Sequence, residues 1–121
     1  MKFELIEKED IRIFKISSDE LLLSDESNAL DIIGNSKYQE VTKIIIAEEN
    51  IAPEFFDLET TIAGNIMQKF TLYGVQLAIV GDFSKYESKS LHDFIFETNK
   101  QGQILFLTSE EEATERLTIG K

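Results

Sequence analysis

Carboxylates follow two short apolar runs of this sequence. Glu48 and Glu49 come directly after KIIIA, and Asp82 comes directly after QLAIVG. In an open α/β sheet, ligands bind beyond the carboxyl ends of the strands, which lie at one edge. If the two runs are neighbouring strands, Glu48 or Glu49 approaches Asp82. Two facing carboxylates could hold Mg²⁺ or share a proton in acid–base catalysis.

The same acids have a simpler interpretation as residues at the start of a helix. Pro53 is typical of the first helical position, and Glu54 and Asp57 would then lie in the first turns. Carboxylates there are stabilised by the helix dipole. We prefer this interpretation and assign no catalytic residue, no metal ligand and no cofactor. A small-molecule or divalent-metal-binding protein, or an enzyme that uses these carboxylates, stays as the alternative.

Two further polar sets are weaker candidates. His92 is the only histidine, and neither Ser84 nor Ser90, which could form a triad with it, stands in a nucleophile-elbow motif. Lys85 and Lys89 could bind an anion, although lysines in a polar loop are more often solvated.

Aromatic side chains among the acids indicate a docking surface. On a helix, Phe55 and Phe56 point about 100° apart, so one can be buried while the other is partly exposed. An exposed ring beside acids would suit protein binding, although core packing is the default for phenylalanine. The predicted interaction or ligand surface comprises Glu48, Glu49, Asn50, Pro53, Glu54, Phe56, Asp57, Asp82, Phe83, Ser84 and Lys85.

The apolar pattern predicts the strands that carry these loops. Residues 2–7 and 11–17 alternate apolar and polar side chains around the acidic turn KED, which is typical of an antiparallel hairpin. KIIIAE and VQLAIVG are continuous apolar runs, typical of strands that are covered on both faces. QILFLT is predicted to be the last strand.

Helical spacing follows the second, third, fourth and fifth strands. The first helix is predicted with Ser24 or Ser27 as its cap and Gly34-Asn35 as its stop. Capping boxes predict the last two helices, at Ser90 with Asp93 and at Ser109 with Glu112.

The longest helix is predicted to begin at Pro53 and to end before Gly74. Apolar residues recur there every three to four positions, at Phe55, Leu58, Ile62, Ile66, Phe70 and Tyr73. The resulting order is β-β-α-β-α-β-α-β-α. We therefore predict one α/β domain over residues 1–121, with a mixed, mostly parallel five-stranded sheet, four helices and the first strand antiparallel.

Composition excludes several classes of function. The 121 residues include no cysteine, which excludes disulfides, thiolate metal sites and cysteine nucleophiles. The net charge of −11 disfavours nucleic acid and anionic lipid as partners and suits a basic protein partner. The N-terminal MKFELIEKED lacks the apolar run of a signal peptide, and no stretch is long enough to span a membrane. We expect a soluble cytoplasmic protein with an unidentified protein partner, or a homodimer.

This order of elements resembles that of the STAS domain (sulphate transporter and anti-sigma-factor antagonist). The segment KIIIAEENIAPEFFDLETTIAGNIMQKFTLYGVQLAIVGD resembles the STAS strand, long helix and strand ending in Gly. In anti-sigma-factor antagonists, the loop before that helix carries a serine that a kinase-like partner phosphorylates. The corresponding residues here are Ile51, Ala52, Pro53, Glu54 and Phe55. The resemblance therefore implies a STAS-like fold without the phosphorylatable serine, where Glu54 at most imitates a permanent charge.

Two segments more closely resemble an uncharacterised bacterial family, domain of unknown function 4180. They are ENIAPEFFDLETTIAGNIMQKF and LAIVGDFSKYESKSLHDFI. This resemblance implies no known activity. We expect a non-enzymatic regulatory or interaction module that uses the predicted surface.

Overall fold

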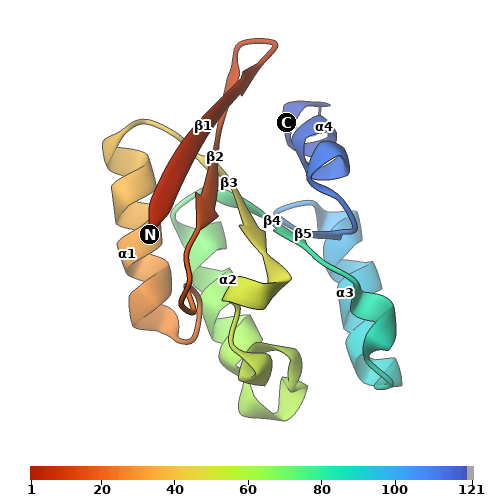
Figure 1. Ribbon diagram of the computed structural model, residues 1–121. Helices are drawn as coiled ribbons and strands as arrows, with labels where there is room; N and C mark the ends of the chain where they lie inside the picture. Colours follow the sequence, from red (N-terminus) through yellow and green to blue (C-terminus); the bar gives the residue numbers. More distant parts are fainter. Residues whose placement is uncertain (120–121) are drawn as a thin grey trace.

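A five-stranded mixed sheet with α-helices on both faces forms the centre of the protein. The computed structural model describes residues 1–119 (Figure 1). Its strands are β1 (Lys2–Lys8), β2 (Ile11–Ser17), β3 (Lys43–Ala47), β4 (Gln76–Val80) and β5 (Ile104–Leu107). Its α-helices are α1 (Glu26–Tyr38), α2 (Ile62–Leu72), α3 (Lys89–Gln101) and α4 (Glu110–Ile119). The predicted α/β class, mixed five-stranded sheet and four helices are confirmed.

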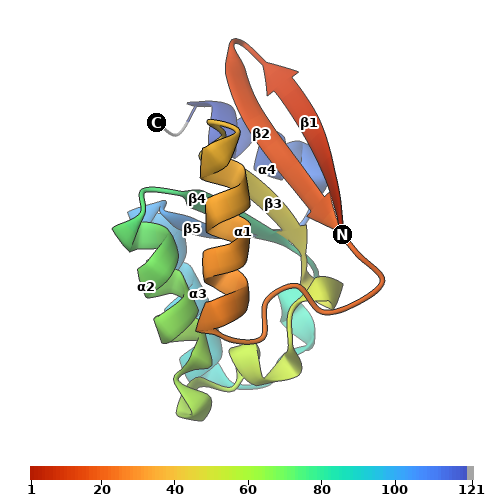
Figure 2. The same ribbon diagram turned by 90° about the vertical axis from the view of Figure 1, so that its left-hand side faces the viewer.

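The strands lie side by side in the order in which the chain makes them. β1 pairs antiparallel with β2, and β2, β3, β4 and β5 are parallel neighbours. Each crossover steps to the next strand in the same direction, so connections of one hand place α1, α2 and α3 on one face. α4 follows the last strand and covers the other face, behind the sheet in Figure 2. No helix within residues 1–119 is long and apolar enough to cross a membrane.

Alternate residues of the inner strands face two different cores, one on each side of the sheet. Ile44 and Ile46 face the larger core beneath α1, α2 and α3, whereas Ile45 faces the smaller core beneath α4. Both faces of β3 are therefore buried, which explains its continuous apolar run.

Two helices begin at residues other than those predicted. The Asp25 side chain, not Ser24 or Ser27, caps α1 by accepting a hydrogen bond from the Asn28 amide at 2.9 Å. Ser88, not Ser90, caps α3 through the Leu91 amide at 3.1 Å. Each cap is the residue whose oxygen reaches the third amide of its helix.

The predicted stop of the first helix is also wrong. α1 continues through Gly34 and Asn35 to Tyr38, and the Asn35 side chain donates to the Asp31 carbonyl one turn earlier. An exposed helical glycine costs about 1 kcal/mol in propensity, which does not end a helix that packs by its other face. For α4, the Ser109 hydroxyl accepts from the Glu112 amide at 3.0 Å, as predicted.

The long helix predicted from Pro53 is wrong as well. Two short 3₁₀ helices, η2 (Pro53–Phe56) and η3 (Leu58–Thr60), precede α2, which begins only at Ile62. The Thr60 hydroxyl donates to the carbonyls of Glu54 and Asp57, both at 2.8 Å, and so competes with helical hydrogen bonds. α2 has 11 residues, fewer than the 13 of α1 or of α3.

A side chain of α3 bonds to the outer side of the last strand. The Phe106 amide donates to Oδ1 of Asn99 at 2.7 Å, and Nδ2 of Asn99 donates to the Phe106 carbonyl at 3.1 Å. Both backbone groups of this edge residue are thereby satisfied without another strand.

Candidate functional site

Glu48 is a carboxylate that the structure buries at the carboxyl end of β3. It begins the 3₁₀ helix η1 (Glu48–Asn50), and its side chain is only 10% exposed. Its Oε2 accepts a hydrogen bond from the Tyr86 hydroxyl and lies 2.9 Å from Nζ of Lys85. A buried carboxylate requires such partners, because its desolvation is otherwise costly.

Tyr86 is the fixed partner of Glu48. Its ring stacks on Phe56, with centroids 5.0 Å apart and an interplanar angle of 21°. Burial of the phenol, and then its hydrogen bond to Glu48, raise the pKa of Tyr86 above its ordinary value. The hydroxyl therefore stays protonated and donates across the neutral pH range.

Lys85 is the solvent-exposed partner of Glu48. It ends the 3₁₀ helix η4 (Phe83–Lys85), and its side chain is 57% exposed. Its Nζ lies 5.5 Å from the centroid of the Tyr86 ring, within the range of a cation–π contact. The ammonium group thus contacts a carboxylate and an aromatic face at once.

Gly81 provides the space for the Glu48 side chain. Ala47 pairs with Val80, so Glu48 and Gly81 leave the sheet side by side. A Cβ at position 81 would lie 2.4 Å from Oε1 of Glu48 and 2.5 Å from its Cβ. Oε1 is therefore turned against the Gly81 backbone, while Oε2 meets Tyr86 and Lys85.

These groups line a pocket of about 480 Å³, which we call the Glu48 pocket. Its apolar wall comes from the connection after β2, from the turn before η2, and from the end of β4. The lining residues are Leu21, Glu48, Glu49, Ile51, Pro53, Phe56, Val80, Gly81, Asp82, Lys85 and Tyr86.

The predicted pair of carboxylates shares this pocket, but each accepts its hydrogen bonds from a different residue. Asp82 is exposed and accepts from the Ser84 hydroxyl at 2.6 Å and from the Ser84 amide at 3.1 Å. These hydrogen bonds lower the pKa of Asp82. Within residues 1–119, no three His, Cys, Asp or Glu side chains gather as a metal-binding group.

The aromatic rings at this edge are core residues. Phe55 is 1% exposed, Phe56 6% and Phe83 8%, so core packing, the default for phenylalanine, is confirmed and neither ring of the Phe55–Phe56 pair is the partly exposed one that would suit docking. Both Phe55 and Phe56 are buried, because the tight η2 turn folds them inward over the sheet. Phe55 and Phe83 both pack against Phe106 of β5, with centroids 6.4 and 5.4 Å away.

Asn50 is also buried and holds two loops together. Its Nδ2 donates to the carbonyls of Ser18 and Glu20, at 2.8 and 3.1 Å. The connection after β2 is thereby fixed against the turn after β3. Burial removes Asn50, like Phe56 and Phe83, from the exposed part of the predicted surface.

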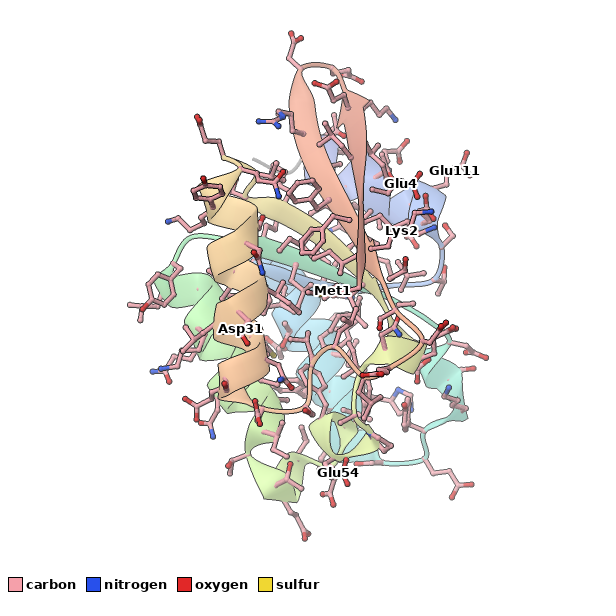
Figure 3. The ribbon with its side chains drawn as sticks, turned by 60° about the vertical axis from the view of Figure 1, so that its left-hand side comes forward. Met1, Lys2, Glu4, Asp31, Glu54 and Glu111 are labelled. Carbon is pink, nitrogen blue, oxygen red and sulfur yellow. The ribbon has the colours of Figure 1, made fainter. Side chains whose placement is uncertain are left out.

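The remaining predicted residues form an exposed, acidic rim. Glu49, Pro53, Glu54, Asp57, Ser84 and Lys85 are exposed, as is Asp82. Figure 3 shows Glu54 at the end of the molecule opposite the β1–β2 turn, with its side chain directed outward.

We call the loops after the four parallel strands, with the first turns of the helices that follow, the acidic edge. It comprises residues 17–28, 48–61, 81–93 and 108–112. Its only lysines or arginines are Lys85 and Lys89. It contains most of the acids of the chain, namely Asp19, Glu20, Asp25, Glu26, Glu48, Glu49, Glu54, Asp57, Glu59, Asp82, Glu87, Asp93, Glu110, Glu111 and Glu112.

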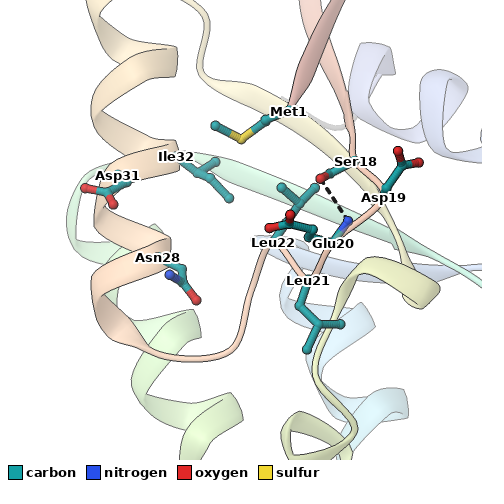
Figure 4. A pocket seen from close by; sticks show the side chains of 9 residues that line it. All are labelled: Met1, Ser18, Asp19, Glu20, Leu21, Leu22, Asn28, Asp31 and Ile32. Carbon is teal, nitrogen blue, oxygen red and sulfur yellow. Dashed lines mark hydrogen bonds between the residues drawn. The ribbon is translucent and has the colours of Figure 1, made fainter.

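A second pocket, of about 370 Å³, lies beside the first between the β2–α1 connection and α1 (Figure 4). Leu21 lines both pockets. Figure 4 shows the Glu20 amide donating to the Ser18 hydroxyl, at 3.0 Å, in the loop that closes one side. Its lining residues are Met1, Ser18, Asp19, Glu20, Leu21, Leu22, Asn28, Asp31 and Ile32.

The predicted set of site residues omits two that shape the Glu48 pocket, Gly81 and Tyr86, although both lie in the loop after β4 that supplies Asp82, Ser84 and Lys85. The loop before the long helix is also predicted to end at Pro53, whereas α2 begins only at Ile62. Thr60 and Thr61 stand directly before α2, so hydroxyl groups do precede this helix, although no serine does. The polar residues Ser84, Ser90 and His92 form no triad, since the Ser84 hydroxyl donates to Asp82 and the His92 ring contacts the Tyr86 carbonyl.

Comparison with known proteins gives one match. The profile of the family described as Domain of unknown function (DUF4180) matches residues 8–117. Comparison with curated proteins and with solved structures gave no significant match. The matched range contains four of the five strands, every loop of the acidic edge and most of α4. The chain therefore belongs to the DUF4180 family.

Proposed function

We propose that the protein is a non-enzymatic, cytoplasmic interaction module that binds a basic protein partner through its acidic edge. The observation that carries this proposal is the distribution of charge. The loops of one edge contain most of the acids, whereas lysines and arginines lie mainly elsewhere in the chain. Lys15 and Lys69 pair with two of these acids, Glu110 and Glu26, and the remaining excess of carboxylates attracts a basic surface and orients it during encounter.

The ionisable groups at the strand ends support a binding role over a catalytic one. Glu48 is neutralised by Lys85 and bonded by Tyr86, and Asp82 is bonded by Ser84. Each group has a partner within the protein, whereas a general acid or base must reach a substrate proton. The resemblance to STAS domains supports a regulatory role by fold analogy alone.

Affinity capture with charge-reversed variants tests the proposal. The immobilised protein is compared with a Glu54→Lys/Asp57→Lys variant on the acidic edge, and captured proteins are identified by mass spectrometry. The matched control, Glu4→Lys/Glu7→Lys, makes the same charge change on β1, which Figure 3 shows well away from Glu54.

We expect a basic protein that the wild type and the control capture and that the acidic-edge variant loses. It should elute in about 0.5 M salt, because exposed charges are screened over a few ångströms at that ionic strength. Equal capture by all three proteins would contradict the proposal.

A further inference from the structure

We propose that the Glu48 pocket accepts the ammonium group of a lysine side chain from the basic partner, in place of Lys85. This inference rests on the proposed function and names the group that the acidic edge would recognise. The pocket contains one buried anion, Glu48, whose two neighbours differ in how firmly they are held.

Tyr86 forms a fixed wall of the pocket, whereas Lys85 is a removable occupant. The Tyr86 ring is stacked on Phe56, and its hydroxyl is directed at Oε2 of Glu48. The Lys85 side chain is more than half exposed, so only its ammonium group is tied to the pocket. Keeping this long, largely solvated side chain in one position costs side-chain entropy.

Lys85 shows that an ammonium group fits at this point. Its Nζ lies 2.9 Å from the Glu48 carboxylate and 5.5 Å from the centre of the Tyr86 ring. An ammonium from outside would make the same two contacts. The apolar side chains of Leu21 and Pro53 in the lining suit the methylene stem of a lysine.

The orientation of the carboxylate favours lysine over arginine. Oε1 of Glu48 is turned against Gly81, and only Oε2 is bonded to Tyr86 and Lys85. A guanidinium group binds carboxylates best through two parallel hydrogen bonds to both oxygens. An ammonium is a compact charge that needs one oxygen, so the pocket suits it better.

Lys85 therefore competes with the partner for its own site. The apparent association constant of a ligand is its intrinsic value multiplied by the fraction of time during which the site is open. If Lys85 fills the pocket about nine-tenths of the time, its removal raises the affinity for a lysine side chain about tenfold.

Peptide titrations of lysine variants test the inference. The probes are a neutral, end-blocked peptide with a single lysine, the same peptide with arginine or norleucine instead, and n-butylammonium. Binding is followed by NMR at the Gly81 amide. Lys85→Ala is compared with Lys89→Ala, which removes the same charge at the first residue of α3 but leaves Glu48 untouched, because Lys89 pairs with Asp93.

We expect Lys85→Ala to bind the lysine peptide about tenfold more tightly than the wild type. Lys89→Ala should change this affinity less than about twofold, because its charge is exposed and screened. Adding Glu48→Gln to Lys85→Ala should abolish the gain, and the arginine and norleucine peptides should gain less.

Two outcomes would overturn the inference. Equal gains in Lys85→Ala and Lys89→Ala would mean that general charge, not the pocket, attracts the peptide. Binding of n-butylammonium as tightly as the peptide would mean that the pocket takes a free amine. The comparison of the two lysine variants decides the matter even if the Glu48→Gln variant does not fold. Neither outcome affects the capture experiment, which leaves Glu48 and Lys85 intact.

Discussion

Gly81 lets the Glu48 side chain lie back against the end of the sheet. A methyl group at position 81 would lie far inside contact distance of both Oε1 and Cβ of Glu48. We expect Gly81→Ala to lower the free energy of unfolding by about 1–3 kcal/mol, as overpacking does. Urea denaturation measures this change.

A second variant separates the two clashes. The loss should persist in a Glu48→Ala background, because the Cβ of residue 48, 2.5 Å from the added carbon, is still present. Gly64→Ala is the matched control. This glycine lies within α2 with no atom within 4 Å of an added Cβ, so the substitution should stabilise by about 0.5–1 kcal/mol. A Gly81→Ala variant with the same free energy of unfolding as the wild type would contradict the close contact.

The hydrogen bond from Tyr86 to Glu48 predicts a pH dependence. Removal of the hydroxyl in Tyr86→Phe leaves a buried carboxylate with one partner fewer and should cost about 1–3 kcal/mol near pH 7. Folding raises the pKa of Tyr86 above the ordinary value of about 10. The protonated phenol therefore contributes its full stabilisation below pH about 10, and the contribution is lost as the pH rises through the folded pKa.

The difference in unfolding free energy between wild type and Tyr86→Phe should accordingly shrink above pH about 10. Urea denaturation of both proteins between about pH 7 and pH 11 measures it. Because the two proteins have the same lysines, titration of those side chains cancels in the comparison. A difference that stays constant over this range would contradict the buried hydrogen bond.

The segment between β3 and α2 contains a strained residue. Thr61 has φ 61°, in the left-handed region that a β-branched side chain rarely adopts. We expect Thr61→Gly to raise the free energy of unfolding by about 1 kcal/mol, since glycine adopts this conformation without a steric penalty. Thr71→Gly, at an exposed position inside α2, should lower it by about 0.5 kcal/mol. Chemical denaturation gives both values, and equal signs would contradict the assigned conformation.

The strands follow directly from the sequence because their patterns are strong and local. β3 and β4 are apolar on both faces, and the β1–β2 hairpin alternates around a polar turn. The segment before α2 was not predictable from spacing. Apolar residues at positions 55, 58 and 62 fit one helix as well as they fit two short turns and a later helix. Side-chain hydrogen bonds of Asp57 and Thr60 select the turns.

The candidate site was predictable in place but not in chemistry. The rule that loops after parallel strands meet at one edge correctly brings Glu48 and Asp82 into one pocket. The burial of Glu48 depends on Tyr86, which lies 38 positions away in the sequence and carries no local signal. The burial of Phe55 and Phe56 depends on the 3₁₀ turn η2, which apolar spacing does not distinguish from the start of an α-helix.

At the scale of the whole molecule, the acidic edge sets like charges close together. The chain carries a net charge of −11, and most of its acids belong to the loops and first helical turns of the acidic edge. This self-repulsion destabilises the folded state and is screened by salt. We expect the melting temperature to rise as NaCl increases to about 0.5 M.

Charge reversal at the edge should reduce this response to salt. Glu54→Lys/Asp57→Lys should gain less in melting temperature than Glu4→Lys/Glu7→Lys, which leaves Glu54 and Asp57 unchanged. Thermal unfolding followed by circular dichroism measures how the melting temperature of the wild type and of each variant changes with NaCl concentration. Identical slopes would show that repulsion is spread evenly over the surface.

The bidentate contact of Asn99 with Phe106 has a consequence for assembly. β5 and β1 are the two ends of the sheet, and the Asn99 side chain occupies the amide and carbonyl of Phe106 on β5, which a neighbouring strand would use. Strand addition is therefore directed to β1, where the charged side chains of Lys2 and Lys8 discourage it. If strands can be added at only one end of the sheet, two molecules can pair, but an open-ended ribbon cannot form. Asn99→Ala should remove this stop, and fibre formation in agitated, concentrated solutions of the variant, but not of the wild type, would reveal it.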